Sequence, residues 1–137
     1  MTNKLLIAVP LIATAAALSF AARSEEADER PASKAPPVEV LGEPVSCVNA
    51  SRIRNTQVHD DYTIDFNLGS GEIYRNTLPN RCPQLGFEES FAYEANVGQL
   101  CSIDMISVIQ RGAAGRGPRC SLGKFVPVRY VKDAGAD

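Results

Sequence analysis

The chain has 137 residues, a formal net charge of −2, four cysteines, one histidine and no tryptophan. A near-neutral charge argues against a nucleic-acid-binding protein, because such proteins usually carry a basic excess. The hydrophobic content of 45% is inflated by an apolar N-terminal segment, so the class of the protein has to be judged from the rest of the chain.

The first residues of the chain have the pattern of a secretory signal peptide over 1–21. Lys4 precedes an apolar run from Leu5 to about Leu18, and Ser19 and Ala21 stand at the −3 and −1 positions of a cleavage site. A basic start, about 7–15 apolar residues and a small-x-small site define such a leader. This run is shorter than the roughly 20 apolar residues that a membrane span needs. An uncleaved membrane anchor is the alternative. We therefore expect export to the periplasm or the medium, without stable membrane insertion after cleavage.

Residues 22–44 are rich in Ala, Glu and Pro and poor in large apolar side chains. Such a segment cannot bury enough surface to offset its ordering entropy. We predict a disordered tether over 22–44, a single small domain over 45–130 and a flexible tail over 131–137. The predicted domain carries nine basic and eight acidic residues, so its own charge is close to neutral.

All four cysteines fall within the predicted domain, at spacings of 35, 19 and 19 residues. An even count in a small exported domain indicates two disulfides. None of the spacings is the close pair that zinc sites and redox motifs show. The pairing that we prefer joins Cys82 to Cys101 and Cys47 to Cys120, so that the second bridge ties the two ends of the domain. Spacing alone leaves the other two pairings open.

The first predicted strand covers about 48–58, and a β-hairpin follows over 62–77. Apolar and polar residues alternate from Tyr62 to Leu68, which is typical of a half-buried strand. A two-residue turn at Gly69-Ser70 would oppose Phe66 to Ile73 and collect the apolar residues on one face. The other, exposed face would then carry three candidate partner-binding side chains: Asp65, Tyr74 and Asn76.

The only histidine, His59, precedes Asp60 and Asp61 between the first strand and the hairpin. We interpret this stretch as a turn with an exposed histidine, because Asp favours turns. The alternative is a small hydrolase or metal-dependent enzyme in which His59 works with nearby aspartates, including Asp65. Two ligands do not hold a catalytic metal, so we assign no catalytic residue, metal ligand or cofactor.

The second half of the domain predicts three more strands, over 91–93, 100–110 and 124–129. Ile and Val favour a strand over 100–110, with a helix as the alternative. Pro127 has no N–H donor, which indicates that the last strand lies at a sheet edge.

A glycine-rich loop separates the last two predicted strands. Its glycines and Pro118 argue against regular structure, and it contains three arginines: Arg111, Arg116 and Arg119. Such a loop is a candidate site for an anion or a polysaccharide, and a flexible solvated loop is the alternative. In sum, about six short strands and two disulfides predict an all-β, mainly antiparallel domain, either a small barrel or a curved sheet.

The blocks YRNTLPNRCPQLGF, GQLCSIDMISVI and GPRCSLGKFVPV occur together in this order. In these blocks the chain, over roughly 47–128, resembles a family of small exported bacterial proteins, chiefly proteobacterial, known as a domain of unknown function. The resemblance implies export and a β-rich domain, and it supplies no substrate, cofactor or catalytic residue. The usual pattern of that family includes the aspartates of DDYTI and does not require a histidine at position 59.

Three functions remain to be weighed. The absence of a catalytic motif favours a non-catalytic binding or structural module of the envelope, with a protein or a polysaccharide as partner and no nucleic acid. A hydrolase or metal-dependent enzyme built on His59 is the second hypothesis. Binding of an anion or polysaccharide through Arg111, Arg116 and Arg119 is the third.

Overall fold

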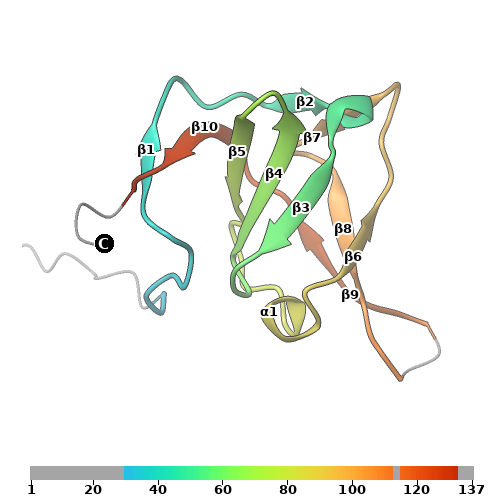
Figure 1. The fold of residues 1–137 in the computed structure, drawn as a ribbon. Coiled ribbons are helices and arrows are strands. Elements are labelled where there is room, and N and C mark those ends of the chain that lie inside the picture. Colours follow the sequence, from blue (N-terminus) through green and yellow to red (C-terminus); the bar gives the residue numbers. More distant parts are fainter. Residues whose placement is uncertain (1–29, 113–114, 133–137) are drawn as a thin grey trace, which may run out of the picture. The chain divides into compact units, whose positions relative to one another are not determined.

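The computed structural model describes residues 30–112 and 115–132. The predicted signal peptide, the first part of the predicted tether and most of the predicted tail lie outside these residues. The chain divides into two units, Met1–Arg30 and Pro31–Asp137, and the architecture below is that of the second unit. Its described residues form ten strands in three antiparallel sheets, one turn of α-helix and one turn of 3-10 helix (Figure 1).

The bounds of the elements in chain order are β1 Val38–Val40, β2 Cys47–Asn49, the 3-10 helix η1 Ala50–Arg52, β3 Asn55–Val58, β4 Thr63–Gly69, β5 Glu72–Thr77, α1 Leu85–Glu88, β6 Phe91–Tyr93, β7 Gln99–Cys101, β8 Met105–Ile109, β9 Arg116–Ser121 and β10 Phe125–Tyr130. The largest sheet has the strand order β1-β10-β5-β4-β3, the second has the order β6-β8-β9, and β2 pairs with β7. The all-β, antiparallel prediction is confirmed. The described strands form open sheets and not a closed barrel, as the curved-sheet alternative requires.

Two of the six predicted strands are each interrupted by a side chain that binds the backbone. Asn49 accepts a hydrogen bond from the Ser51 N–H (3.0 Å) and starts η1, so the strand predicted over 48–58 divides into β2 and β3. Asp104 accepts one from the Cys101 N–H (2.7 Å) and separates β7 from β8. Asn and Asp side chains compete with strand ladders in this way.

The glycine-rich segment is more regular than predicted. Residues 116–121 form β9, which pairs with β8 over Arg116–Ser121. Pro118 is compatible with this strand because β9 is the last strand of its sheet, and one of its edges has no partner strand among the described residues. The prediction of irregular structure is therefore wrong for these residues.

Residues 31–44 are not the disordered tether that composition predicts. Val38, Glu39 and Val40 form β1 and pair with the last three residues of β10. The backbone oxygen of Pro36 also accepts a hydrogen bond from Arg75 (2.9 Å). Few apolar side chains are needed here, because the backbone of β1 satisfies the free edge of β10 directly.

Addition of β1 also corrects the expected position of Pro127. Its strand, β10, lies between β1 and β5 and is not a sheet edge. The Pro127 oxygen accepts the Leu41 N–H (2.9 Å), just beyond the end of β1. The N–H and C=O of a residue in an antiparallel strand point to the same side. The side on which Pro127 lacks an N–H is therefore the side of β1, and the ladder between β10 and β5 loses no hydrogen bond.

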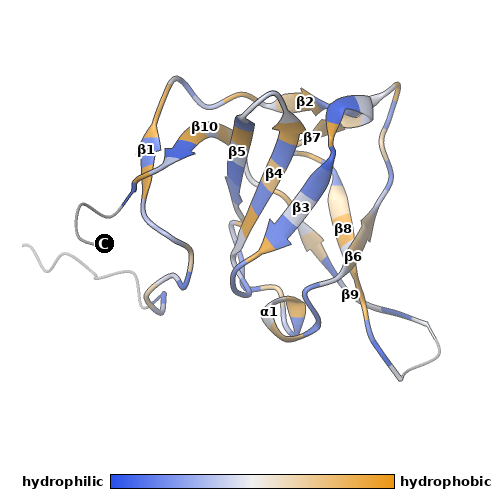
Figure 2. Cartoon of the chain, viewed as in Figure 1, coloured by the Kyte–Doolittle hydropathy of each residue, from blue (hydrophilic) through white to orange (hydrophobic). Residues whose placement is uncertain are grey.

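The core lies between the largest sheet and the β6-β8-β9 sheet. Figure 2 shows apolar and polar residues alternating along β4, and Ile64 and Phe66 of this strand are fully buried. The ring of Phe66 packs edge-on against Phe91 of β6 (6.1 Å between centroids) and Phe125 of β10 (5.4 Å). Each such buried side chain contributes roughly 1.5–3 kcal/mol, so this junction is a main source of stability.

The two disulfides join Cys47 to Cys101 and Cys82 to Cys120, so the preferred pairing of the sequence analysis is wrong. Cys47 and Cys101 lie directly opposite each other in the β2-β7 ladder, which decides the first bond. The second joins the loop before α1 to β9. Two disulfides indicate an oxidising compartment.

Candidate functional site

The β4-β5 hairpin has a register one residue away from the predicted one. Phe66 opposes Tyr74, not Ile73, and the ladder is irregular between Asn67 and Gly69. The turn residues Gly69, Ser70 and Gly71 all have positive φ angles, a conformation that glycine adopts readily. The bulge moves every β5 side chain to the opposite face from the predicted one.

The predicted exposed face with Asp65, Tyr74 and Asn76 does not exist. Asp65 is 2% exposed and Asn76 is fully buried, while Tyr74 is half-buried against the core. The Asn76 side chain donates to the Gly123 oxygen (2.7 Å) and accepts from the Gly123 N–H (2.8 Å). Asn76 therefore fixes the loop before β10 and is not available to a partner.

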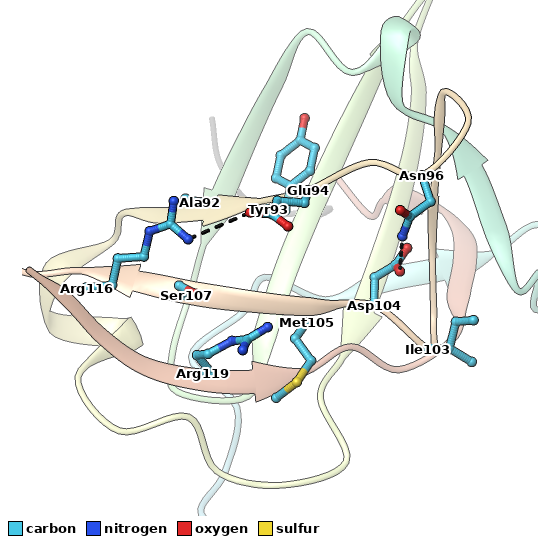
Figure 3. Close-up of a pocket in the computed structure, with 10 residues that line it drawn as sticks. All are labelled: Ala92, Tyr93, Glu94, Asn96, Ile103, Asp104, Met105, Ser107, Arg116 and Arg119. Atoms are coloured by element: carbon cyan, nitrogen blue, oxygen red, sulfur yellow. Dashed lines mark hydrogen bonds and ion pairs between the residues drawn. The ribbon is translucent and has the colours of Figure 1, made fainter.

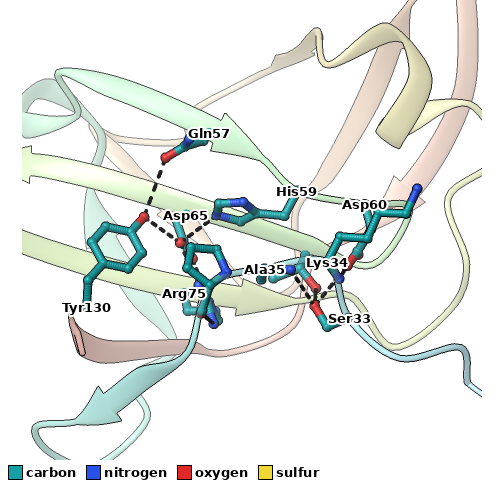
Figure 4. Close-up of polar contacts among 11 residues, drawn as sticks. Ser33, Lys34, Ala35, Gln57, His59, Asp60, Asp65, Arg75 and Tyr130 are labelled. Atoms are coloured by element: carbon teal, nitrogen blue, oxygen red, sulfur yellow. Dashed lines mark hydrogen bonds and ion pairs between the residues drawn. The ribbon is translucent and has the colours of Figure 1, made fainter. Parts of the chain in front are cut away.

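Asp65 lies at the centre of a polar cluster on the other face of the largest sheet (Figure 4). Arg75 donates two hydrogen bonds to its carboxylate, from Nε (2.8 Å) and Nη2 (2.9 Å). The Tyr130 hydroxyl donates a third bond (2.7 Å), and His59 Nε2 lies 2.7 Å from Oδ2. Strands β4, β5 and β10 and the turn after β3 are thereby joined through one carboxylate.

The cluster shifts the pKa values of its members in the directions that the ion pair favours. Burial alone would raise the pKa of Asp65, but the hydrogen bonds from Arg75, Tyr130 and His59 bring this pKa below its usual value. The hydrogen bond to Asp65 raises the pKa of Arg75. Burial, together with the Asp65 carboxylate, raises the pKa of Tyr130 to about 12. Asp65 is thus an ionised structural anchor at neutral pH.

The prediction that His59 is exposed is wrong, since its side chain is 7% exposed. An ionised carboxylate only accepts hydrogen bonds. His59 Nε2 is therefore protonated and donates a hydrogen bond to Asp65. Apart from this contact, the His59 side chain has no hydrogen bond within the described residues, and none of their serine, threonine or cysteine side chains bonds to its imidazole. Two members of a Ser-His-Asp arrangement are present without a nucleophile in place.

Asp60 and Asp61 organise the turn, as the sequence predicts for aspartates at this position. Asp60 accepts hydrogen bonds from the N–H of Tyr62 (2.8 Å) and of Lys34 (3.0 Å). Asp61 accepts one from the Gly86 N–H (2.8 Å) and forms an ion pair with Arg81. The turn therefore fastens the N-terminal segment on one side and α1 on the other.

A groove of about 260 Å³ lies on the outer face of the β6-β8-β9 sheet. Ala92, Ser107 and Arg119 stand opposite one another on its three strands, so two small side chains and one long cationic side chain form a row across the sheet. Figure 3 shows Arg116 and Ile103 at opposite ends of this groove. We call it the arginine groove.

The arginines of the glycine-rich segment are not equivalent. Arg116 forms a long ion pair with Glu94 (3.8 Å) in which both side chains are mostly exposed, and Arg119 has no hydrogen bond or ion pair within the described residues. Arg111 does not line the groove, and its backbone N–H donates to Glu88 (3.1 Å). The structure thus brings together two of the three predicted residues.

The apolar part of the arginine groove was not predicted from the sequence. Ile103 is 88% exposed and Met105 is 39% exposed, and both line the groove beside the cations. The alternation of side chains along β8 could have indicated that Met105 points outward. The signal was weak because apolar residues occupy both the odd and the even positions of this stretch. Asp104 accepts hydrogen bonds from Asn96 (3.1 Å) and the Cys101 N–H and also lines the groove, so the groove contains one further carboxylate besides Glu94.

No group of three or more His, Cys, Asp or Glu side chains among the described residues is placed to hold a metal ion. No helix in the same part of the chain is long and apolar enough to cross a membrane. No protein-family model, curated protein or solved structure matches the chain. The family resemblance of the sequence therefore stays a prediction.

Proposed function

We propose that the protein is an exported, non-catalytic binding module whose arginine groove binds the acidic groups of a polymeric ligand. The row formed by Ala92, Ser107 and Arg119 carries this proposal. It provides a cation without a counter-charge above a floor of small side chains, which leaves room for a ligand chain to reach that cation. Export is supported by the leader pattern and by the two disulfides, which persist in oxidising compartments.

The two arginines of the groove can bind an acidic ligand, although the acidic residues Glu94 and Asp104 line it as well. The Arg116–Glu94 pair is 70% and 86% exposed, and such surface pairs contribute only about 0–1 kcal/mol. Arg116 can therefore exchange Glu94 for a ligand carboxylate, sulfate or phosphate at little cost. Arg119 has no ion pair within the described residues that a ligand would have to replace. The exposed Ile103 and Met105 would add apolar contact with the backbone of the same ligand.

Column retention tests the proposal with two acidic polymers, heparin and immobilised poly-glutamate. We expect the purified protein to stay bound to at least one of them beyond about 0.2 M salt, since charge contacts weaken steeply with salt. Arg119→Glu should weaken binding tenfold or more, because charge-assisted hydrogen bonds contribute about 1.5–3 kcal/mol. Preference for heparin would identify a polysaccharide ligand, and preference for poly-glutamate an acidic protein segment.

Arg54→Glu is the matched control, because Arg54 is exposed, precedes β3 and does not line the groove. It changes the net charge by the same amount as Arg119→Glu. Equal weakening by both variants would show that net charge and not the groove is responsible. Elution of the unaltered protein below about 0.2 M salt from both columns would exclude this ligand class.

A further inference from the structure

A second hollow is bounded by residues 31–34, the turn after β3 and α1. Its volume is about 650 Å³, within the range of about 300–1,000 Å³ that small-molecule sites occupy. It shares no lining residue with the arginine groove. It is therefore a separate feature, which we call the turn cavity.

One wall of the turn cavity is an exposed aromatic ring on a firmly held turn. Phe87 is 84% exposed and lines the cavity. The single helical turn that carries it is flanked by Gln84 and Glu89, which both have positive φ angles although neither is glycine. Strained backbone of this kind persists only where the surroundings over-determine it, and it concentrates at functional sites.

Three contacts fix this turn from below. Leu85 is fully buried, the Gly86 N–H donates to Asp61, and Cys82 is bonded to Cys120. A side chain at position 86 would approach the backbone of Asp60 to 3.0 Å, so the turn and the strand connection are in close contact. Phe87 is thus held outward with its ring largely exposed, which the hydrophobic effect alone would not favour.

A second wall contains an unpaired polar atom on a buried side chain. His59 lines the cavity, its side chain is 7% exposed, and its Nε2 is committed to Asp65. Nδ1 has no hydrogen-bond partner within the described residues. No fully buried side-chain nitrogen or oxygen of that part of the chain lacks a partner, so Nδ1 is reached by solvent. With Nε2 protonated, Nδ1 is a hydrogen-bond acceptor that solvent can reach.

The rest of the lining is mixed: Pro31 and Ala32 are apolar, and most of the other residues are polar. Asp60 and Asp61 accept hydrogen bonds from the protein, but an ionised carboxylate has about four acceptor positions, and some of these remain open. The ammonium group of Lys34 has no hydrogen bond or ion pair within the described residues. The cavity therefore combines an apolar ring face and a small apolar patch with several acceptors and the donor groups of Lys34 and Arg81.

We propose that the turn cavity binds a saccharide through a pyranose ring stacked on Phe87. A pyranose with equatorial hydroxyl groups has flat C–H faces, which the negative face of an aromatic ring attracts, and a rim of hydroxyl groups. One hydroxyl would donate to His59 Nδ1, and others would bond to Asp60 and Lys34. A flat aromatic ligand would satisfy Phe87 but leave the polar rim unpaired, which is costly in a pocket.

NMR titration with cellobiose tests this proposal, because the C2 and C3 hydroxyls of both its glucose rings are equatorial. We expect cellobiose to shift the backbone signals of residues 84–88 and the imidazole nitrogens of His59. Phe87→Ala should weaken this binding at least tenfold, whereas Phe87→Tyr should retain it. Sorbitol, which has hydroxyl groups but no ring, should shift neither set of signals at the same concentration.

Val97→Ala is the control for loss of an exposed apolar side chain, because Val97 is fully exposed and does not line the cavity. It should leave cellobiose binding unchanged, as should Arg119→Glu. Equal effects of cellobiose and sorbitol, or undiminished binding by Phe87→Ala, would overturn the proposal. An absence of shifts up to about 10 mM cellobiose, a weak-binding limit, would overturn it as well. These outcomes do not depend on heparin or poly-glutamate binding, so the two proposals can fail separately.

Discussion

The Asp65 cluster and the arginine groove use the same kinds of charged residue in opposite ways. Asp65 is 2% exposed and contacts Arg75, Tyr130 and His59. Arg119 is exposed and contacts no charged side chain within the described residues. A charge whose bonding capacity is already used inside the protein stabilises the fold, whereas a charge held without a partner is available to a ligand.

Removal of the central carboxylate should have the largest effect on this comparison. Asp65→Ala leaves the largely buried Arg75 without its counter-charge, and breaking a buried ion pair costs about 3–5 kcal/mol. Glu72→Ala breaks the exposed Arg52–Glu72 pair and should cost less than about 1 kcal/mol. Urea denaturation of both variants gives the two values. Similar losses would show that the Asp65 cluster is not the structural anchor described above.

The bond between Cys82 and Cys120 joins the loop before α1 to β9, the strand that carries Arg116 and Arg119. Replacing both cysteines by alanine should lower the free energy of unfolding by about 2–4 kcal/mol. On loop length alone, the Cys47–Cys101 bond should contribute a nearly equal free energy, because the bonded cysteines are 54 residues apart there and 38 residues apart in the Cys82–Cys120 bond. Because Cys82 is fully buried, we expect the first double variant to be the less stable in thermal denaturation. The reverse order would show that packing around Cys82 contributes little.

The pH dependence of stability should show the smallest effect, with Asp65 and Asp60 contributing to its acid limb and Tyr130 to its alkaline limb. The pKa of Asp65 is lowered, so its contribution is present above the ordinary value of about 4 and is lost as the pH falls below it. The pKa of Tyr130 is raised to about 12, so its contribution is complete below about pH 10 and is lost between about pH 10 and 12.

Tyr130→Phe separates the two limbs of this profile in denaturation experiments at several pH values. It should remove the alkaline loss and leave most of the acid loss, since Arg75 still contacts Asp65. Arg119→Gln should leave both limbs unchanged. A full alkaline loss in Tyr130→Phe would assign that limb to another of the four tyrosines.

Local patterns in the sequence were sufficient for several elements. The alternation from Tyr62 to Leu68 identifies β4 and its buried face, and the Asp pair after His59 predicts the turn that joins β3 to β4. The even number of cysteines predicts two disulfides. Each of these signals lies within a few residues, where side-chain periodicity and turn chemistry act directly.

The wrong predictions share a dependence on distant parts of the chain. Composition could not reveal that β10 offers a free edge to β1, and cysteine spacing could not reveal the β2-β7 ladder that places Cys47 opposite Cys101. The bulge at Gly69 shifts the register of β5 by one residue and so moves Tyr74 and Asn76 to the opposite face of the sheet from the predicted one. A period-two pattern says which residues share a face, but one inserted residue reverses the answer for the partner strand.

By itself, the sequence of this protein determined an antiparallel β domain with two disulfides, a turn at His59-Asp60-Asp61 and a set of arginines near its end. Only the tertiary structure decided that Asp65 is an anchor, that Arg116 and Arg119 share a groove while Arg111 does not, and that His59 faces a cavity. The reason is that Asp65 meets Tyr130 across 65 positions of the chain. Contacts at such separations follow from which strand edges and buried polar groups find partners, and no local pattern records that outcome.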